Sequence, residues 1–189
     1  VWLYHSHTYE TKDVNAGLIG TIVVTARGMA KPDGTPKDVD REFVTLFMNF
    51  DENVSWYREY NIQTYAEDPG SVDRKEIFQD NETGFRGFIE SNLMHSINGF
   101  VFSNNPMLVM KKGERVRWYI VALGNANHTP HWHAHTVLHS GTQTDTLLIA
   151  PAMMLTADMV TDNVGTWMYH CHVNFHLDAG MHILYRVDP

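Results

Sequence analysis

The sequence has 189 residues and a formal net charge of −8; 19% of its residues are charged and 43% are hydrophobic. This length suffices for one large domain, or for one domain with part of a second, and an acidic chain is not expected to bind nucleic acid or an anionic membrane. The single cysteine excludes an intramolecular disulfide, and the longest apolar run, nine residues at 147–155, is too short to span a membrane.

The predicted elements are short strands separated by turns, and no segment has the pattern of a long helix. A β-branched run at 19–26 ends at Arg27 and Gly28, and turn-forming residues follow. Residues 52–95 are less regular and are expected to form a long excursion. The remaining strands are expected at 43–50, 107–110, 115–123, 166–170 and 181–187, with a hairpin turn at 111–114. This spacing predicts an all-β fold, an antiparallel β-sandwich.

Three parts are expected along the chain. Residues 1–29 are too few to build a sandwich alone, and we interpret them as the last strands of a preceding domain. Residues 30–42 are the expected linker, and 43–189 the expected complete domain. The chain starts at Val1 without an initiator methionine, so we expect that the beginning of the first domain precedes it.

The distribution of histidine is the most informative feature of the composition. The chain has twelve histidines, of which five lie within 128–139 and four within 170–182, while His5 and His7 form a third group. Such clusters indicate metal binding. Zinc is the obvious rival to a redox metal, but a structural zinc site needs four ligands and these clusters offer more.

The strongest motif surrounds the only cysteine. Cys171 is followed by His176 and Met181, and a thiolate, two imidazoles and a distant thioether are the ligands of a blue-copper site. His128 is the natural candidate for the second imidazole. A place in the hydrophobic core would explain Cys171 or Met181 taken singly, but the ordered set favours copper.

Alternation along a strand indicates a second metal site behind the first. The neighbours of Cys171, His170 and His172, would point to the opposite face of the strand. His131 and His133 form another pair on one face, as do His5 and His7. Cys171 would then give a short covalent route between two metal centres, as electron transfer to a separate reaction site requires.

These motifs resemble those of the multicopper oxidases, and in particular the ceruloplasmin-like branch. Segments at 17–20, 50–53, 55–57 and 97–99 resemble that branch as well, so the resemblance covers nearly the whole chain. It implies a cupredoxin-like Greek-key β-sandwich with three types of copper centre. The implied ligands are His128, Cys171, His176 and Met181 for type 1 copper, His131 for type 2, and His5, His7, His133, His170 and His172 for the type 3 pair.

The implied function is that of a laccase-like oxidase. A small phenol or aryl amine would give single electrons to the type 1 copper, and Cys171, His170 and His172 would carry them to a trinuclear cluster that reduces O₂ to water. Phe175 favours an organic donor, because related ferroxidases can have at this position an aspartate that helps to hold iron; Phe175 could equally be a packing residue. Three alternatives stay open: a blue-copper electron-transfer or copper-binding module, a ferroxidase or other metallo-oxidase, and a two-domain nitrite reductase.

The resemblance also implies that the cluster is incomplete in this chain. Such oxidases use eight cluster histidines and six are present here, so a further His-x-His pair is expected upstream or from another chain. Small members of the family place the cluster between subunits, which implies a homotrimer, and their usual location implies an extracellular or periplasmic protein. His135 and His139 are expected around the metal ligands or at the surface and not as ligands, and His95 and His182 are expected to be structural.

Overall fold

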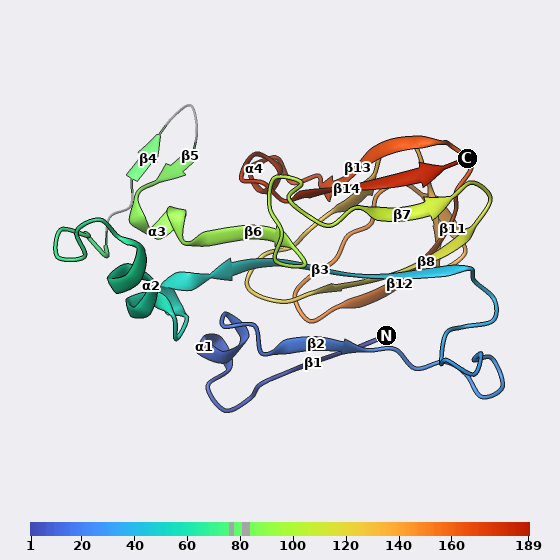
Figure 1. The fold of residues 1–189 in the computed structure, drawn as a ribbon, viewed down its shortest axis with the longest axis horizontal. Helices are drawn as coiled ribbons and strands as arrows, with labels where there is room; N and C mark the ends of the chain where they lie inside the picture. The colour runs from blue at the N-terminus through green and yellow to red at the C-terminus, as the bar shows by residue number, and fades with distance from the viewer. Residues whose placement is uncertain (76–77, 81–83) are drawn as a thin grey trace.

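The computed structural model describes residues 1–75, 78–80 and 84–189. Two packed sheets form the body of the molecule, and a separate hairpin of the N-terminal residues lies alongside it (Figure 1). In chain order the elements are β1 (Trp2–His5), α1 (Glu10–Val14), β2 (Ile19–Ile22), β3 (Arg41–Asp51), the 3-10 helix η1 (Glu52–Val54), α2 (Arg58–Tyr65), β4 (Phe78–Asp80), β5 (Gly84–Arg86), α3 (Phe88–Ser91), β6 (Leu93–Ile97), β7 (Leu108–Lys111), β8 (Arg115–Ala122), β9 (Pro130–Trp132), β10 (Val137–His139), β11 (Thr142–Thr144), β12 (Met154–Val160), β13 (Gly165–Cys171), α4 (Asn174–Asp178) and β14 (His182–Asp188).

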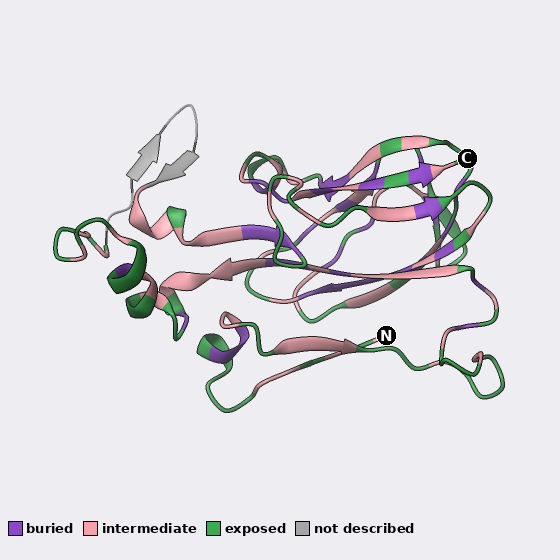
Figure 2. Ribbon diagram, in the orientation of Figure 1, coloured by how far each residue is buried: buried purple, intermediate pink, exposed green. Residues whose placement is uncertain are grey.

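The hydrophobic core lies between the two sheets of the sandwich. One sheet has the order β11-β10-β12-β8-β3-β6 and the other the order β7-β14-β13-β9. The buried segments gather on the strands of both sheets (Figure 2), and in β8 the five residues 118–122 are all buried. Trp118, Trp132 and Tyr169 are fully buried, with the Trp132 and Tyr169 rings stacked 4.7 Å apart. These aromatic side chains contribute much of the apolar area that stabilises the sandwich.

The turn at 111–114 is not a hairpin, and this part of the sequence prediction is wrong. Strand β7 pairs in parallel with β14, whereas β8 pairs with β3 and β12 in the opposite sheet. The chain therefore crosses from one layer to the other at this turn, where Gly113 has a φ of +88° that favours glycine. A tight turn has the same residue preferences in both arrangements, so the sequence did not distinguish them. Because β7 pairs in parallel with β14 and β3 pairs in parallel with β8, both sheets are mixed and the sandwich is not purely antiparallel.

The N-terminal residues form a two-stranded sheet of their own. Strands β1 and β2 pair antiparallel from Trp2–Ile22 to His5–Ile19, and β2 ends earlier than the β-branched run predicted. The hairpin lies beside the six-stranded sheet (Figure 1), where the Leu3 N–H donates to Met154 Sδ at 3.0 Å. The division into a first-domain part, a linker and a complete domain stays a prediction.

The described residues between 52 and 92 form most of the excursion predicted at 52–95, whose last residues, 93–95, belong to β6. It projects at one end of the sandwich and contains η1, α2 and α3 (Figure 1). The longest helix there, α2, has eight residues. Within the described ranges, no helix is both long and apolar enough to cross a membrane.

Candidate metal centre

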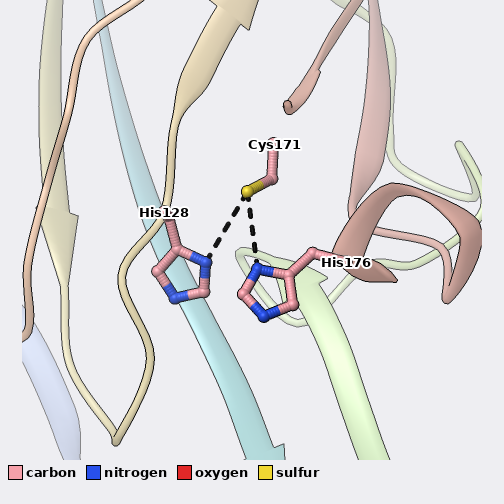
Figure 3. A group of neighbouring side chains, drawn as sticks. All are labelled: His128, Cys171 and His176. Atoms are coloured by element: carbon pink, nitrogen blue, oxygen red, sulfur yellow. Dashed lines mark hydrogen bonds between the residues drawn. The ribbon is translucent and has the colours of Figure 1, made fainter. Parts of the chain in front are cut away.

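Three buried side chains from three elements converge at one end of the sandwich. Cys171 ends β13, His176 lies in the short helix α4, and His128 lies in the loop before β9 (Figure 3). The Cys171 Sγ is 3.5 Å from His176 Nδ1 and 3.9 Å from His128 Nδ1. Helix α4 directly follows β13, so the chain turns back and returns His176 to the end of the strand.

This donor set fits a single soft metal ion such as copper. A metal about 2.0 Å from a nitrogen and about 2.3 Å from a sulfur, at a trigonal angle, holds the two ligand atoms roughly 3.7 Å apart, which lies between the two observed distances. Burial lowers the pKa of His128 to about 3 and that of His176 to about 4, so both imidazoles are neutral, the form that binds metal. A thiolate with two imidazoles is the equatorial set of a blue-copper centre.

Met181 belongs to the same loop and the same core. Its side chain is fully buried in the hydrophobic cluster that contains Cys171. Its backbone is hydrogen-bonded to the backbones of Cys171 and His176. The Cys171 N–H donates to the Met181 carbonyl at 3.0 Å, and the Met181 N–H donates to the His176 carbonyl at 2.8 Å. With Met181 as the distant thioether, the site is of the type 1 kind.

Four further imidazoles form a second group, here called the four-histidine group: His131, His133, His170 and His172. Neighbouring rings lie 5.0–5.4 Å apart, and the Nε2 atoms of His133 and His170 are 3.1 Å apart. His131 Nδ1 lies 3.0 Å from the Asp145 carbonyl, and His170 Nδ1 lies 2.9 Å from the Cys171 carbonyl. When these Nδ1–H groups donate, the Nε2 atoms of His131 and His170 keep free lone pairs, and three members of the group, His131, His133 and His170, lie close enough to hold a metal ion.

Strand alternation separates the two sites, as the sequence predicted. In β13 the register places Cys171 opposite Pro130 and His170 opposite His131. Cys171 points into the core toward His128 and His176, whereas His170 joins the four-histidine group. Burial lowers the pKa of His170 to about 4, which keeps this imidazole neutral as well.

His5 and His7, here called the N-terminal pair, lie apart from the four-histidine group. Their rings are 4.7 Å apart, and each Nδ1 lies within 3.8 Å of a Glu10 carboxylate oxygen. These three residues form their own potential metal group. Strand β1, which ends in His5, lies on the far side of the sandwich from β13 (Figure 1). One chain therefore brings together four of the six histidines that the resemblance assigns to the cluster.

Known proteins match the chain over nearly all of its length. Residues 68–189 match the family described as "Multicopper oxidase". The chain belongs to the multicopper oxidase family. Its curated relatives include hephaestin of Rattus norvegicus, 43% identical over 99% of the chain, Ferroxidase HEPHL1 of Homo sapiens, 41% identical over 99%, and human ceruloplasmin, 38% identical over 98%. It spans only 16–17% of the length of these relatives.

Solved structures confirm the predicted fold of this multicopper oxidase chain. The multicopper oxidase mgLAC superposes with a TM-score of 0.68 at 19% identity, and the blue copper oxidase of Nitrosomonas europaea with 0.65 at 21%. Each match covers 98% of the present chain and 55% of the other. The chain thus has the cupredoxin-like sandwich of multicopper oxidases.

Two residues that the sequence did not connect with copper lie beside the type 1 site of this multicopper oxidase chain. The His95 ring centre is 5.3 Å from that of His176, and His95 Nε2 is 3.3 Å from Glu90 Oε1. Burial lowers the pKa of His95 and raises that of Glu90. His95 was predicted to be structural. The signal available in the sequence was a carboxylate, Glu90, five residues before this histidine.

The other histidines of the multicopper oxidase chain have partners of their own. His135 Nδ1 is 2.8 Å from the Tyr185 hydroxyl, His139 Nδ1 is 2.9 Å from the Thr156 carbonyl, and His182 Nδ1 is 2.8 Å from the Ser103 hydroxyl. None of the three belongs to a metal group found among the described residues. Beside the four-histidine group lies a hollow of about 940 Å³, which is lined by His131 and His133 and by several carboxylates, including Asp145 and Asp162.

Proposed function

We propose that this chain is part of a metallo-oxidase that takes electrons from a reduced metal ion, with Fe²⁺ as the preferred substrate. The observation that carries the proposal is the Glu90–His95 pair beside His176. A carboxylate and an imidazole are the ligand types used for Fe²⁺ at non-haem sites. One similar protein is named a ferroxidase, whereas the comparisons do not specifically support the laccase-type activity favoured by the sequence.

The position of the pair suits electron entry. The His95 ring centre lies 5.3 Å from that of His176, and His95 Nε2 lies 3.3 Å from Glu90 Oε1. Phe175, which the sequence analysis considered as a docking surface for an organic donor, contacts the His95 ring edge-on at 5.1 Å. This contact favours the packing alternative for Phe175, because it braces the imidazole of His95.

The chain supplies the electronic link between the two sites. When bound, type 1 copper supplies a one-electron acceptor. Cys171 is covalently joined to His170 and His172, and the hydrogen bond from His170 Nδ1 to the Cys171 carbonyl adds a second connection. The imidazoles of the four-histidine group would hold type 2 and type 3 copper, which would supply the reduction of O₂ to water.

The remaining cluster ligands are proposed to come from another subunit. The N-terminal pair and the four-histidine group are separate within this chain, and β1 lies across the sandwich from β13 (Figure 1). A homotrimer in which each N-terminal pair docks at the hollow of the next subunit would unite them, and a further His-x-His pair would complete the set. An extracellular or periplasmic location is proposed with it.

The test compares two substrates in the full-length protein. Replacing Glu90 by Gln should lower kcat/KM for Fe²⁺ by roughly 10- to 100-fold, the usual effect of losing one metal-binding partner. Oxidation of an aryl amine should stay within about twofold, because an organic donor needs no carboxylate ligand. Equal losses for both substrates would contradict the proposed metal route, and a wild-type protein that oxidises only the aryl amine would support the laccase alternative.

Copper counting tests the broader oxidase assignment. The proposal expects type 1 copper together with the cluster copper and uptake of O₂ during turnover. One copper per chain without O₂ uptake would instead indicate a blue-copper electron-transfer or copper-binding module. Nitrite reduction without the absorption of a coupled copper pair would indicate the nitrite reductase.

A further inference from the structure

A side-chain amide touches the ring nitrogen of His176 that faces away from Cys171. Asn49 lies on β3, where it pairs with His95 of β6, and its Nδ2 is 3.3 Å from His176 Nε2. Its other polar atom, Oδ1, is buried and has no hydrogen-bond partner among the described residues. Buried amide oxygens are nearly always hydrogen-bonded, so this contact calls for an explanation.

The two nitrogens of His176 have different surroundings. Nδ1 faces Cys171 Sγ at 3.5 Å, and Nε2 lies on the side of the ring turned away from the sulfur (Figure 3). A metal at Nδ1 requires that atom to be unprotonated, so the proton of a neutral imidazole must sit on Nε2. Nε2 then becomes a hydrogen-bond donor, which the NH₂ group of Asn49 cannot accept.

Turning the Asn49 amide by half a turn removes this conflict. The turn exchanges Oδ1 and Nδ2, since the two ends of an amide have nearly the same shape. Oδ1 would then accept the proton of Nε2, and the NH₂ group would take the buried position that Oδ1 holds here.

We propose that Asn49 is a positioning residue for type 1 copper, whose amide oxygen accepts a hydrogen bond from His176 Nε2 when Nδ1 binds the metal. A hydrogen bond at this position raises the basicity of the ligand imidazole and fixes its ring. A more basic ligand favours Cu²⁺ over Cu⁺, so Asn49 lowers the reduction potential of the site. The inference concerns the type 1 site alone and holds whatever donates the electrons.

Two substitutions of nearly equal shape separate this role from simple packing. Asn49→Leu removes the acceptor, and Asn49→Asp keeps an acceptor that cannot donate. In the copper-loaded full-length protein, the type 1 reduction potential should rise in N49L and fall in N49D, with the blue absorption retained in both. Asn105, whose amide bonds only to the backbone of Pro106 and Leu184, is the matched control, and N105L should leave the potential unchanged.

A second measurement removes the effect of the added charge in N49D. The Nε2 proton of His176 in the oxidised protein can be followed by electron–nuclear double resonance while it exchanges into D₂O. Exchange should be about tenfold faster in N49L than in the wild type, as expected for loss of one hydrogen bond, and should stay slow in N49D. Unchanged exchange in N49L, or potential shifts of the same sign in both variants, would overturn the proposal.

Discussion

The indole Nε1 of Trp56 donates a 2.7 Å hydrogen bond to the carboxylate of Asp13, 43 residues earlier in the chain. The other carboxylate oxygen of Asp13 accepts from the Ser6 hydroxyl at 2.5 Å, and Ser6 lies between His5 and His7. These hydrogen bonds, that of Ser6 first and that of Trp56 second, hold the pKa of Asp13 below its usual value. One ionised carboxylate thus joins the N-terminal pair to the excursion that follows β3.

Replacing Trp56 by Phe should loosen the N-terminal hairpin. The ring contacts with Tyr9 would be largely kept, but the donor to Asp13 would be lost. We expect proteolysis between residues 15 and 40 to become about tenfold faster, because local opening depends on the few contacts that hold a segment. The blue absorption should not change. Trp2→Phe, at an exposed position, is the control, and equal proteolysis in both variants would contradict the anchoring role.

Replacing Cys171 by Ser should abolish the type 1 site selectively. The intense visible absorption of a blue site depends on the thiolate, which a hydroxyl cannot replace. Absorption should disappear and the copper content should fall by about one ion per chain, since a blue site holds a single ion. Met181→Leu should retain the band, because the axial ligand is weak. A blue C171S protein would show that the thiolate lies elsewhere.

The metal-free protein should lose stability as the pH falls. In the folded state burial lowers the pKa of His128 to about 3 and those of His170 and His176 to about 4. As the pH falls through about 6.5, these histidines become protonated in the unfolded chain but stay neutral in the folded chain. The free energy of unfolding that the protein has above this pH therefore decreases as the pH approaches 4. At pH 5 unfolding should take up about three protons from these sites.

This linkage is measured as the slope of the unfolding free energy against pH in urea titrations. His176→Gln should reduce the proton uptake by about one, since each site contributes one proton. A stability that is constant between pH 7 and 5 would contradict the neutral state of the buried imidazoles.

Ala134 offers a test of backbone strain beside the four-histidine group. It lies between His133 and His135 and has a φ of +62°, in the left-handed region. Ala134→Gly should raise the unfolding free energy by about 1 kcal/mol, because glycine adopts this conformation without the clash of a Cβ. Ala66→Gly, at a φ of −74°, should lower it by roughly 0.5 kcal/mol through added chain entropy. Stabilisation by both substitutions would exclude the strain explanation.

The sequence predicted features within short segments, such as ligand spacing and strand alternation, better than contacts between strands far apart in the chain. The spacing of Cys171, His176 and Met181 indicated one loop around one metal, and the structure has that loop, because ligand order along a short segment restricts its geometry. The alternation around Cys171 likewise follows from the period of a strand. By contrast, the contacts of His95 and Asn49 with His176 arise from the pairing of β3 and β6, which no local pattern encodes. The layer change at Gly113 was missed for the same reason.

The distance between the N-terminal pair and the four-histidine group has a consequence for genetics. In the proposed assembly each reaction site combines residues from two chains, so a variant lacking His5 and His7 and a variant lacking His170 and His172 would each be inactive alone. Mixed subunits would contain some interfaces in which both halves are intact. Co-expression of the two variants should therefore restore part of the O₂ uptake, whereas a site built within one chain would stay inactive in every combination.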